Sequence, residues 1–224
     1  MVQTRTRQAG DSENEQVARR GRPVGDRDAR RAELLQAAVS VIAEEGYAST
    51  SLRNVARRAG CTTGAVTYYF SSKEKLLTAL VESRFDSYDA MLEAVRDDAD
   101  IESLIRRWLV HSTGDPEYWP VMSQLLAHAR YEPALAAIIE RRYARFRKEY
   151  ASILAAGQAR GVVRDDIPAD LLADQLSASG DGWMLMFPFE RERFTPSRVD
   201  AIVESILTLL RPPAGGGRSA AAGA

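Results

Sequence analysis

Two short apolar periods separated by a glycine turn constrain the fold of this chain more than any other feature. Between Ser51 and Lys73 the sequence reads SLRNVARRAGCTTGAVTYYFSSK. Its first half places four apolar residues at the spacing of one helical face: Leu52, Val55, Ala56 and Ala59. Gly60 follows, where a left-handed backbone costs glycine little. We therefore predict two short helices joined by a tight turn, with Ser51 and Thr62 as their N-caps.

The second of these helices is predicted to end near Phe70, and its outward side is poorly suited to burial. Val66 and Phe70 stand four residues apart and form its apolar face. Gly64 and Tyr68 fall on the opposite face, where they present bare backbone and a phenol. Such an outer side is typical of the second helix of a helix-turn-helix, which lies in the DNA major groove and contacts base edges. The pattern therefore predicts a DNA-reading head.

The stretch from Ala29 to about Leu80 resembles the signature of TetR-family transcriptional regulators. The motifs AxxAG, GAVxxYF and KExL follow one another here at the spacing of that family. Thr67 stands where the family often has a tyrosine, which leaves the base contact at that position open. Cys61 stands where a valine is usual, and it is expected to pack as a small apolar residue. Beyond this stretch the resemblance is limited to a similar helical layout.

The resemblance implies roles for particular side chains of the head. One group would face base edges: Thr62, Thr63, Gly64, Thr67 and Tyr68. A second group would contact phosphates: Ser51, Arg53, Tyr69 and Lys73. The resemblance further implies a homodimeric repressor that binds a palindromic double-stranded DNA operator and leaves it when an unidentified small-molecule effector binds.

Composition and charge agree with a DNA-binding protein of the cytoplasm. One cysteine forbids an internal disulfide framework. The first thirty residues lack the apolar segment of a signal peptide, and no apolar run approaches the length of a membrane span, so no membrane partner is expected. Residues 1–76 carry 13 Lys/Arg and 9 Asp/Glu, a net charge of +4, whereas the remainder has a net charge of −5. A positive amino-terminal end is a hint of polyanion binding there.

Helical periodicity continues along the chain and predicts an all-α fold of about nine helices. The predicted parts are a disordered basic arm at 1–26, a three-helix helix-turn-helix domain at 27–71, a helical ligand-binding and dimerisation domain at 72–211 and a disordered tail at 212–224. The arm contains RRGRP at 19–23. This run is interpreted either as a solubilising tail or as a basic arm that contacts phosphates or the minor groove.

A long helix from Ser72 to about Val95 is predicted to leave the reading head, enter the second domain and so transmit motion between them. Further helices are predicted to open at four prolines: Pro116, Pro133, Pro168 and Pro196. The helix that follows Pro133 carries several basic residues beside its apolar stripe: Arg141, Arg142, Arg145, Arg147 and Lys148. We interpret them as a solvated face rather than a second nucleic-acid site.

The last two helices are predicted to form the dimer contact. The final one has a regular apolar stripe: Val199, Ile202, Val203, Ile206, Leu207 and Leu210. The helix before it, at 170–187, mixes large apolar residues with small ones that allow close helix approach. Two such helices from each subunit would make a four-helix bundle. The alternative interpretation, that both helices only complete the core, stays open.

Large or soft apolar residues are unusually frequent in the second domain: Trp108, Tyr118, Trp119, Met122, Trp183 and Met186. Most are expected in the core, and some would line a cavity between helices, where bundles hold their ligands. Methionine and tryptophan suit apolar or flat aromatic ligands, and tryptophan faces also suit cations. The sequence does not choose among these ligand classes.

The sequence shows none of the common catalytic or metal-binding motifs. The sequence contains no GxSxG, no HExxH, no phosphate loop and no dinucleotide fingerprint. His111 and His128 are 17 residues apart, which is not a ligand spacing on one helix turn. We therefore expect no enzyme activity and no cofactor. Two rival functions remain: a helical protein–protein adaptor whose helix-turn-helix is structural, and an α-helical enzyme.

Overall fold

The computed structural model describes residues 24–98 and 100–213, and every regular element within them is a helix. The α-helices are α1 (Val24–Glu45), α2 (Leu52–Arg58), α3 (Thr63–Tyr69), α4 (Lys73–Glu93), α5 (Ile101–Gly114), α6 (Tyr118–Ala129), α7 (Pro133–Ala159), α8 (Ala169–Met186) and α9 (Pro196–Leu210). Two short 3-10 helices, η1 (Tyr47–Ser49) and η2 (Arg191–Arg193), complete the series. The predicted all-α class is confirmed. None of the described helices has the length and apolar character needed to cross a membrane.

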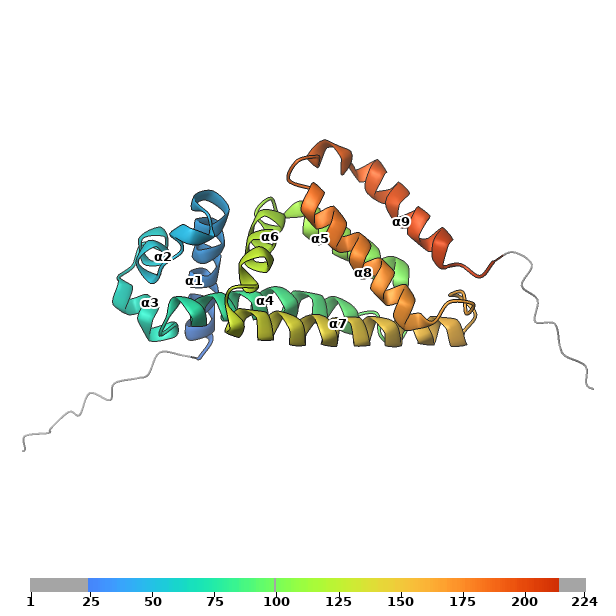
Figure 1. The fold of residues 1–224 in the computed structure, drawn as a ribbon, viewed down its shortest axis with the longest axis horizontal. Coiled ribbons are helices and arrows are strands. Elements are labelled where there is room, and N and C mark those ends of the chain that lie inside the picture. Colours follow the sequence, from blue (N-terminus) through green and yellow to red (C-terminus); the bar gives the residue numbers. More distant parts are fainter. Residues whose placement is uncertain (1–23, 99, 214–224) are drawn as a thin grey trace, which may run out of the picture.

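Helices α1, α2 and α3 gather at one end of the molecule, and α4 leads away from them alongside α7 (Figure 1). The remaining helices stand on this pair: α6 nearest the head, then α5 and α8, with α9 outermost (Figure 1). We call α1–α3 the head and α4–α9 the body. Helix α4 therefore connects the head to the body and packs along the body beside α7, as predicted for a long helix that enters the second domain.

Side-chain caps set the start of three helices in and next to the head. Ser51 accepts a hydrogen bond from the N–H of Asn54 at 3.1 Å, and Thr62 accepts one from Ala65 at 3.2 Å. Ser72 does the same at the start of α4. Each such cap contributes about 1 kcal/mol by pairing a backbone donor that the helix leaves free. These caps were predicted from the sequence because capping depends on neighbouring residues alone.

The first helix begins at Val24. Residues 24–26, assigned from the sequence to a disordered arm, are therefore helical. The RRGRP motif at 19–23 and the tail from residue 214 onward lie outside the described residues. Residues 24–26 contain one large apolar residue, Val24, so they show no apolar period that would predict a helix.

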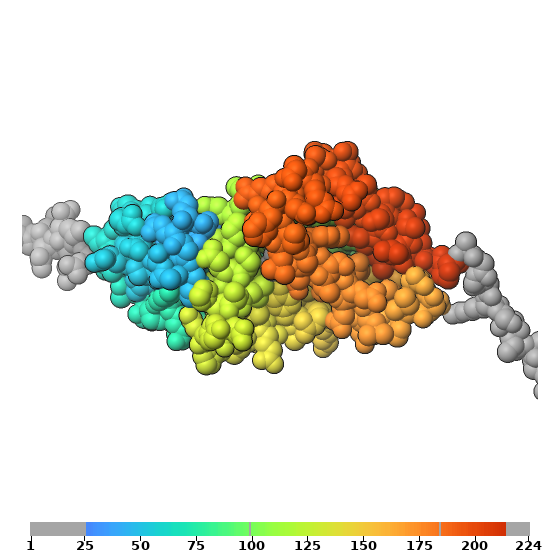
Figure 2. Space-filling view, turned by 45° about the horizontal axis from the view of Figure 1, so that its top comes forward, coloured from blue at the N-terminus to red at the C-terminus, as the bar shows by residue number. Residues whose placement is uncertain are grey.

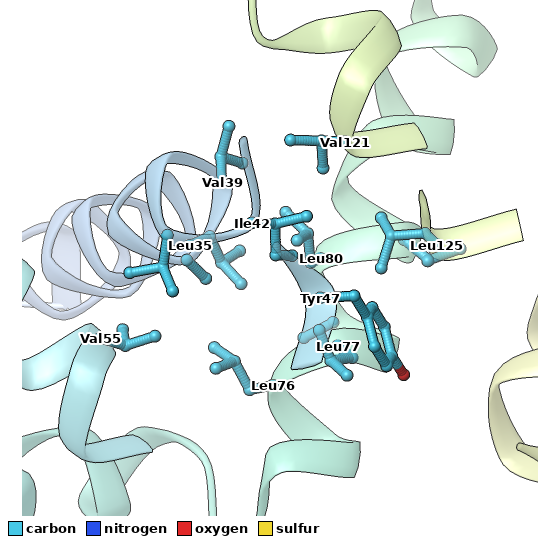
Figure 3. Packing of buried hydrophobic residues seen from close by; sticks show 14 of the residues in the cluster. Leu35, Val39, Ile42, Tyr47, Val55, Leu76, Leu77, Leu80, Val121 and Leu125 are labelled. Atoms are coloured by element: carbon cyan, nitrogen blue, oxygen red, sulfur yellow. The ribbon is translucent and has the colours of Figure 1, made fainter. Parts of the chain in front are cut away.

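One hydrophobic core joins the head to the body. It contains buried residues of α1, α2, α4 and α6 whose side chains meet in Figure 3: Leu35, Val39, Ile42, Val55, Leu76, Leu77, Leu80, Val121 and Leu125. We expected the three short helices of the head to bury one another. They do so only together with the first half of α4 and with α6. A movement of α4 or α6 must therefore disturb the packing of the head.

A second core holds the far end of the body together. Its buried residues come from α4, α5, α7, α8 and α9: Leu92, Ile105, Leu109, Ile153, Leu154, Leu172, Val203 and Leu210 among them. Helix α9 packs mainly against α5 rather than against α8, its neighbour in sequence. This arrangement leaves α8 and α9 splayed apart at the top of the molecule (Figure 1).

The basic residues of α7 lie on an exposed face, as predicted, except for the half-buried Arg142, and four of them also pair with acidic residues of neighbouring helices. Three of them pair with α4: Arg141 with Glu82 at 3.3 Å, Arg142 with Asp86 at 2.7 Å and with Asp89 at 3.1 Å, and Arg145 with Asp89 at 3.5 Å. Arg147 reaches Asp174 of α8 at 3.6 Å. The sequence could not reveal these pairs because their partners lie on other helices.

Candidate DNA interface and internal cavity

Helix α3 turns its apolar side inward and leaves its outer side free. Val66 and Phe70 are buried in the shared core. All five residues predicted to face bases are exposed: Thr62, Thr63, Gly64, Thr67 and Tyr68. The Tyr68 side chain is the most prominent, with 69% of its surface exposed. Gly60, with φ of +62°, makes the left-handed turn that sets α3 across α2.

The first helix supports the outer side of α3, a contact that sequence reasoning missed. The guanidinium of Arg27 lies 5.6 Å from the ring centroid of Tyr68, a cation–π distance. Tyr69 meets the same ring edge-on, with centroids 5.1 Å apart. Arg27 belongs to the polar first turn of α1, so no spacing pattern marks it. The structure adds Arg27 to the positive charges beside the predicted base-reading surface.

The residues predicted to contact phosphates differ in how free they are. Arg53 is exposed, whereas Ser51, Tyr69 and Lys73 are half-buried. Two other arginines of α2 pair with α1, Arg57 with Glu45 at 3.2 Å and Arg58 with Glu44 at 2.5 Å. Among the described residues, Arg53 is therefore the arginine of α2 with no ion-pair partner, which leaves its charge available to a phosphate.

Lys73 is held by the head itself in this structure. Its ammonium donates a hydrogen bond to the backbone carbonyl of Tyr47 at 3.1 Å and lies 4.5 Å from the centroid of that ring. A lysine ammonium has three donors, so this bond leaves two free for a phosphate. The predicted phosphate contact of Lys73 stays a prediction, and the structure adds a second partner.

Tyr47 makes three contacts between the head and the body. Its backbone N–H donates to the side-chain oxygen of Gln124 at 2.8 Å, and its hydroxyl donates to the Glu132 carboxylate at 2.5 Å. Its ring stacks on His128, with centroids 4.0 Å apart. Burial, reinforced by Glu132, raises the pKa of the Tyr47 hydroxyl. We call Tyr47, Gln124, His128 and Glu132 the joint.

The body contains a partly open cavity of about 80 Å³. Rings from two parallel-running helices form much of its wall: Phe85 and Tyr88 on α4, and Tyr143, Phe146 and Tyr150 on α7. The three tryptophans of the chain complete it. Trp108 lies 5.7 Å from Trp119 and 6.1 Å from Trp183, measured between ring centroids. The arrangement is a box of aromatic rings between α4, α5, α6, α7 and α8.

Among the residues that the structure describes, Asp181 is the only charged one in the wall of this cavity. The hydroxyl of Tyr143 donates a hydrogen bond to one of its carboxylate oxygens at 3.0 Å. Burial raises the pKa of the Asp181 carboxyl, while the Tyr143 bond and the charge of Arg147 act in the opposite direction. Burial also raises the pKa of the Tyr143 hydroxyl. A carboxylate in an aromatic box is poorly solvated and lacks a compensating charge.

The cavity contains half of the residues that the sequence suggested for a ligand. Trp108, Trp119 and Trp183 line it. Tyr118 and Met122 are fully buried elsewhere in the core that joins the head to the body, and Met186 lies in a groove between α8 and α9. The structure does not bring these three to the cavity wall.

Sequence reasoning missed the cavity residues of α4 and α7, because they also read as ordinary core. A signal was nevertheless present, since Tyr143, Phe146 and Tyr150 recur at i, i+3 and i+7. Asp181 also carried a signal, because it is the one charge in the run from 175 to 189. An aromatic face on one helix, together with an isolated acidic residue on another, could have indicated this cavity in the sequence.

The large apolar side chains exposed on α8 and α9 are not those of the stripe predicted for dimer contact. Val199, Val203, Ile206 and Leu210 are buried within the chain, and Ile206 also lines the cavity. Five other large apolar side chains are exposed: Leu171, Leu185, Met186 and Phe189 on and after α8, and Leu209 on α9. Two small residues of α8, Ala178 and Gly182, lie exposed between them. Figure 2 shows this surface separated from the head by α6. Periodicity identifies an apolar face but not the helix that covers it.

Two family models match this chain. The model described as bacterial regulatory proteins, tetR family, matches residues 34–80, which span most of α1, all of α2 and α3, and the start of α4. The model described as the C-terminal part of BetI-type transcriptional repressors matches residues 97–212, which span α5 to α9.

Curated relatives and solved structures agree with these matches. The transcriptional regulator BetI of Paraburkholderia phymatum is 33% identical over 147 residues, which cover 61% of this chain and 75% of that protein. The transcriptional repressor NicS of Pseudomonas putida is 30% identical over 149 residues, 62% of this chain and 68% of that protein. A regulator from Pseudomonas aeruginosa PAO1 has the same fold, with a TM-score of 0.69, 20% identity and coverage of 81% of this chain and 90% of that one. A regulator from Saccharomonospora viridis, solved in complex with choline, has a TM-score of 0.64 and 23% identity, with coverage of 81% and 95%.

Proposed function

The chain belongs to the TetR family of bacterial regulatory proteins, and from this premise we propose how it acts: as a homodimer that leaves its operator when a small molecule enters the body. It is a DNA-binding transcriptional regulator, and its named relatives are transcriptional repressors and regulators rather than enzymes. The proposal concerns the parts of this activity that its own residues would perform.

The outer side of α3 carries the proposal for DNA reading. It presents the hydroxyls of Thr63 and Thr67, the bare backbone of Gly64 and the phenol of Tyr68, all exposed on a helix whose other side is buried. We assign base contacts to these residues and to Thr62. We assign phosphate contacts to Arg53, Lys73, Ser51 and Tyr69. Base contacts would set operator preference, whereas phosphate contacts would position the helix in the groove.

A second copy of the chain would cover the apolar surface of α8 and α9. Exposed leucines on α8, Phe189 after it and Leu209 on α9, with small residues of α8 between them, suit the close packing of two helices from each subunit. A two-fold dimer presents two heads related by the same axis. The matching operator is therefore palindromic, with half-sites one or more helical turns apart.

The cavity supports control by a small molecule. A cavity of 150 Å³ holds a molecule as small as benzene, and the cavity here is about 80 Å³. A ligand of more than a few atoms must therefore push its walls apart. Two of the rings in the wall, Phe85 and Tyr88, belong to α4. The same helix begins at Lys73, which lies roughly 22 Å from Tyr88 along the helix at 1.5 Å per residue. A ligand that binds better when α4 is displaced would shift the dimer away from the spacing that the operator fits.

Footprinting with the purified protein on DNA from around its own gene tests this function. We expect protection of a palindromic site, and loss of that protection when Tyr68→Ala replaces the wild type. A protein that protects no site, or that protects it equally well with Tyr68→Ala, would contradict the assignment of α3 as the reading helix. A ligand that binds without changing operator affinity would contradict release by an effector but not DNA reading.

A further inference from the structure

We propose that Arg27 is a positioning residue for DNA reading, which holds the ring of Tyr68 in one orientation on the outer side of α3. The inference rests on the proposed function, because it takes Tyr68 as a base contact. A Tyr68 variant tests that contact by itself, whereas Arg27 variants test how the ring is held. The orientation of the ring can also be measured without DNA, so the two ideas can fail separately.

Tyr68 needs such support because its own helix covers little of it. The residue is 69% exposed and projects from α3, a helix of seven residues. A long side chain on a helix has two favoured χ1 rotamers. A ring that is free to change between them loses this freedom on binding, and the loss weakens the contact with the bases. An interaction that already favours one rotamer in the free protein therefore strengthens the contact.

Two contacts hold the ring in the orientation of this structure. The Arg27 guanidinium lies over the ring, 5.6 Å from its centroid, and the Tyr69 ring meets it edge-on with centroids 5.1 Å apart. Tyr69 is the next residue of the same helix, whereas Arg27 belongs to α1. Of these two contacts, the one with Arg27 therefore ties the ring to a different helix of the head.

The charge of Arg27 is not taken up by an acidic residue. Within the part of the chain that the structure describes, Arg27 forms no ion pair, and its recorded contact is with the Tyr68 ring. Arg30, one turn further along α1, instead pairs with Glu33 at 2.5 Å. A guanidinium is planar and carries its N–H donors at its edge, so it can lie over a ring face and still offer donors to water or to a phosphate. Contact with DNA therefore need not draw Arg27 away from Tyr68.

Arg31 makes the same kind of contact four residues later, with a ring that cannot reach DNA bases. Its guanidinium lies 5.5 Å from the centroid of the Phe70 ring. Phe70 is 2% exposed, so packing already fixes the orientation of that ring. Arg31 is exposed, as Arg27 is. Arg31 is therefore the matched control: the same residue type on the same helix, over a ring that needs no support.

Selection of bound sequences from a library of random DNA duplexes measures the base preference of the full-length protein and its variants. We expect Tyr68→Ala to lose preference at one position of each half-site. Arg27→Gln should reduce discrimination at that same position at least threefold. Arg27→Lys keeps a cation that can lie over the ring and should recover at least half of the loss. Arg31→Gln should leave the preference unchanged.

A double variant and a measurement without DNA separate positioning from direct contact. If Arg27 acts through the ring, Arg27→Gln combined with Tyr68→Ala should show the preference of Tyr68→Ala alone. Nuclear magnetic resonance of protein with isotope-labelled tyrosine reports the χ1 rotamers, and the Tyr68 signal is identified by its loss in Tyr68→Ala. We expect one dominant rotamer in the wild type and in Arg31→Gln, and two rotamers in Arg27→Gln.

Four results would overturn the inference. The first two are unchanged Tyr68 rotamers in Arg27→Gln and an Arg27→Lys protein that discriminates no better than Arg27→Gln. The third is an effect of Arg27→Gln on preference that persists beside Tyr68→Ala, which would make Arg27 a direct base contact. The fourth is uniform weakening of all sequences with a lower salt dependence, which would make it a phosphate contact. Unchanged preference in Tyr68→Ala would instead contradict the proposed base contact, even where the rotamers show that Arg27 holds the ring.

Discussion

The hydroxyl of Tyr47 donates a hydrogen bond of 2.5 Å to the carboxylate of Glu132, 85 residues further along the chain. Tyr47 belongs to the head, and Glu132 stands at the start of α7, the helix that carries cavity rings. The carbonyl of the same Tyr47 accepts from Lys73, the first residue of α4. Helices α4 and α7 both carry rings of the cavity, and both begin at a contact with Tyr47 of the head.

Removing this hydroxyl should weaken the connection between ligand and DNA. Tyr47→Phe keeps the ring that stacks on His128 and deletes the donor to Glu132. We expect a loss of about 1 kcal/mol in the free energy of unfolding, because a half-buried carboxylate oxygen loses its partner. We also expect a smaller ratio between operator affinities measured without and with a saturating effector.

Tyr131→Phe is the matched control, because Tyr131 is exposed and three residues away from His128. It should change neither quantity. An unchanged affinity ratio in Tyr47→Phe, combined with the expected loss of stability, would make the joint a structural contact without a part in signalling.

The reading head should separate into residues that set preference and residues that set overall affinity. Thr67→Ala and Tyr68→Ala should change the preferred operator bases by about 1–3 kcal/mol each. Arg53→Ala should weaken all sequences alike and reduce the salt dependence of binding by about one ion. Arg57→Ala is the control for charge, because Arg57 is already paired with Glu45. Binding to a library of operator variants at several salt concentrations measures both effects, and a change of base preference in Arg53→Ala would reverse the assigned roles.

A charge placed on α9 should have different effects at an exposed and at a buried position, because only the exposed one can lie in the proposed dimer interface. Leu209 is 66% exposed, so Leu209→Glu should yield folded monomers with greatly weakened operator binding. Ile206 is 6% exposed and lines the cavity, so Ile206→Glu should destabilise the protomer by several kcal/mol instead. Light scattering and thermal unfolding distinguish the two. A Leu209→Glu protein that remains dimeric would place the interface elsewhere.

Features that depend on neighbouring residues could be predicted from the sequence, and those that depend on distant ones could not. Pro133 and Pro196 open α7 and α9 as expected, because a proline at the first turn acts locally. The stripe of α9 was real, but whether Ile206 faced its own chain or a second copy depended on where α5 lies. The contact of Arg27 with Tyr68 and the meeting of Tyr143 with Asp181 likewise required the packing of separate helices.

The buried carboxyl of Asp181 should make stability depend on pH in a particular sense. Burial raises its pKa in the folded protein, so between the ordinary aspartate pKa of about 3.9 and the raised value the folded state holds more protons than the unfolded state. Stability from this group is thus present below the ordinary pKa and is lost as the pH rises through the folded-state pKa. Asp181→Asn, which cannot ionise, should therefore melt at a higher temperature than the wild type at neutral pH.

This difference should shrink as the pH falls toward the ordinary aspartate pKa, and Asp170→Asn, at an exposed site, should show no such trend. Melting curves of the three proteins at a series of pH values measure it. If Asp181→Asn instead melted lower than the wild type without any ligand, the hydrogen bond from Tyr143 would outweigh the cost of burying the charge. The carboxylate would then be a structural partner of α7 rather than a buried charge that lowers stability.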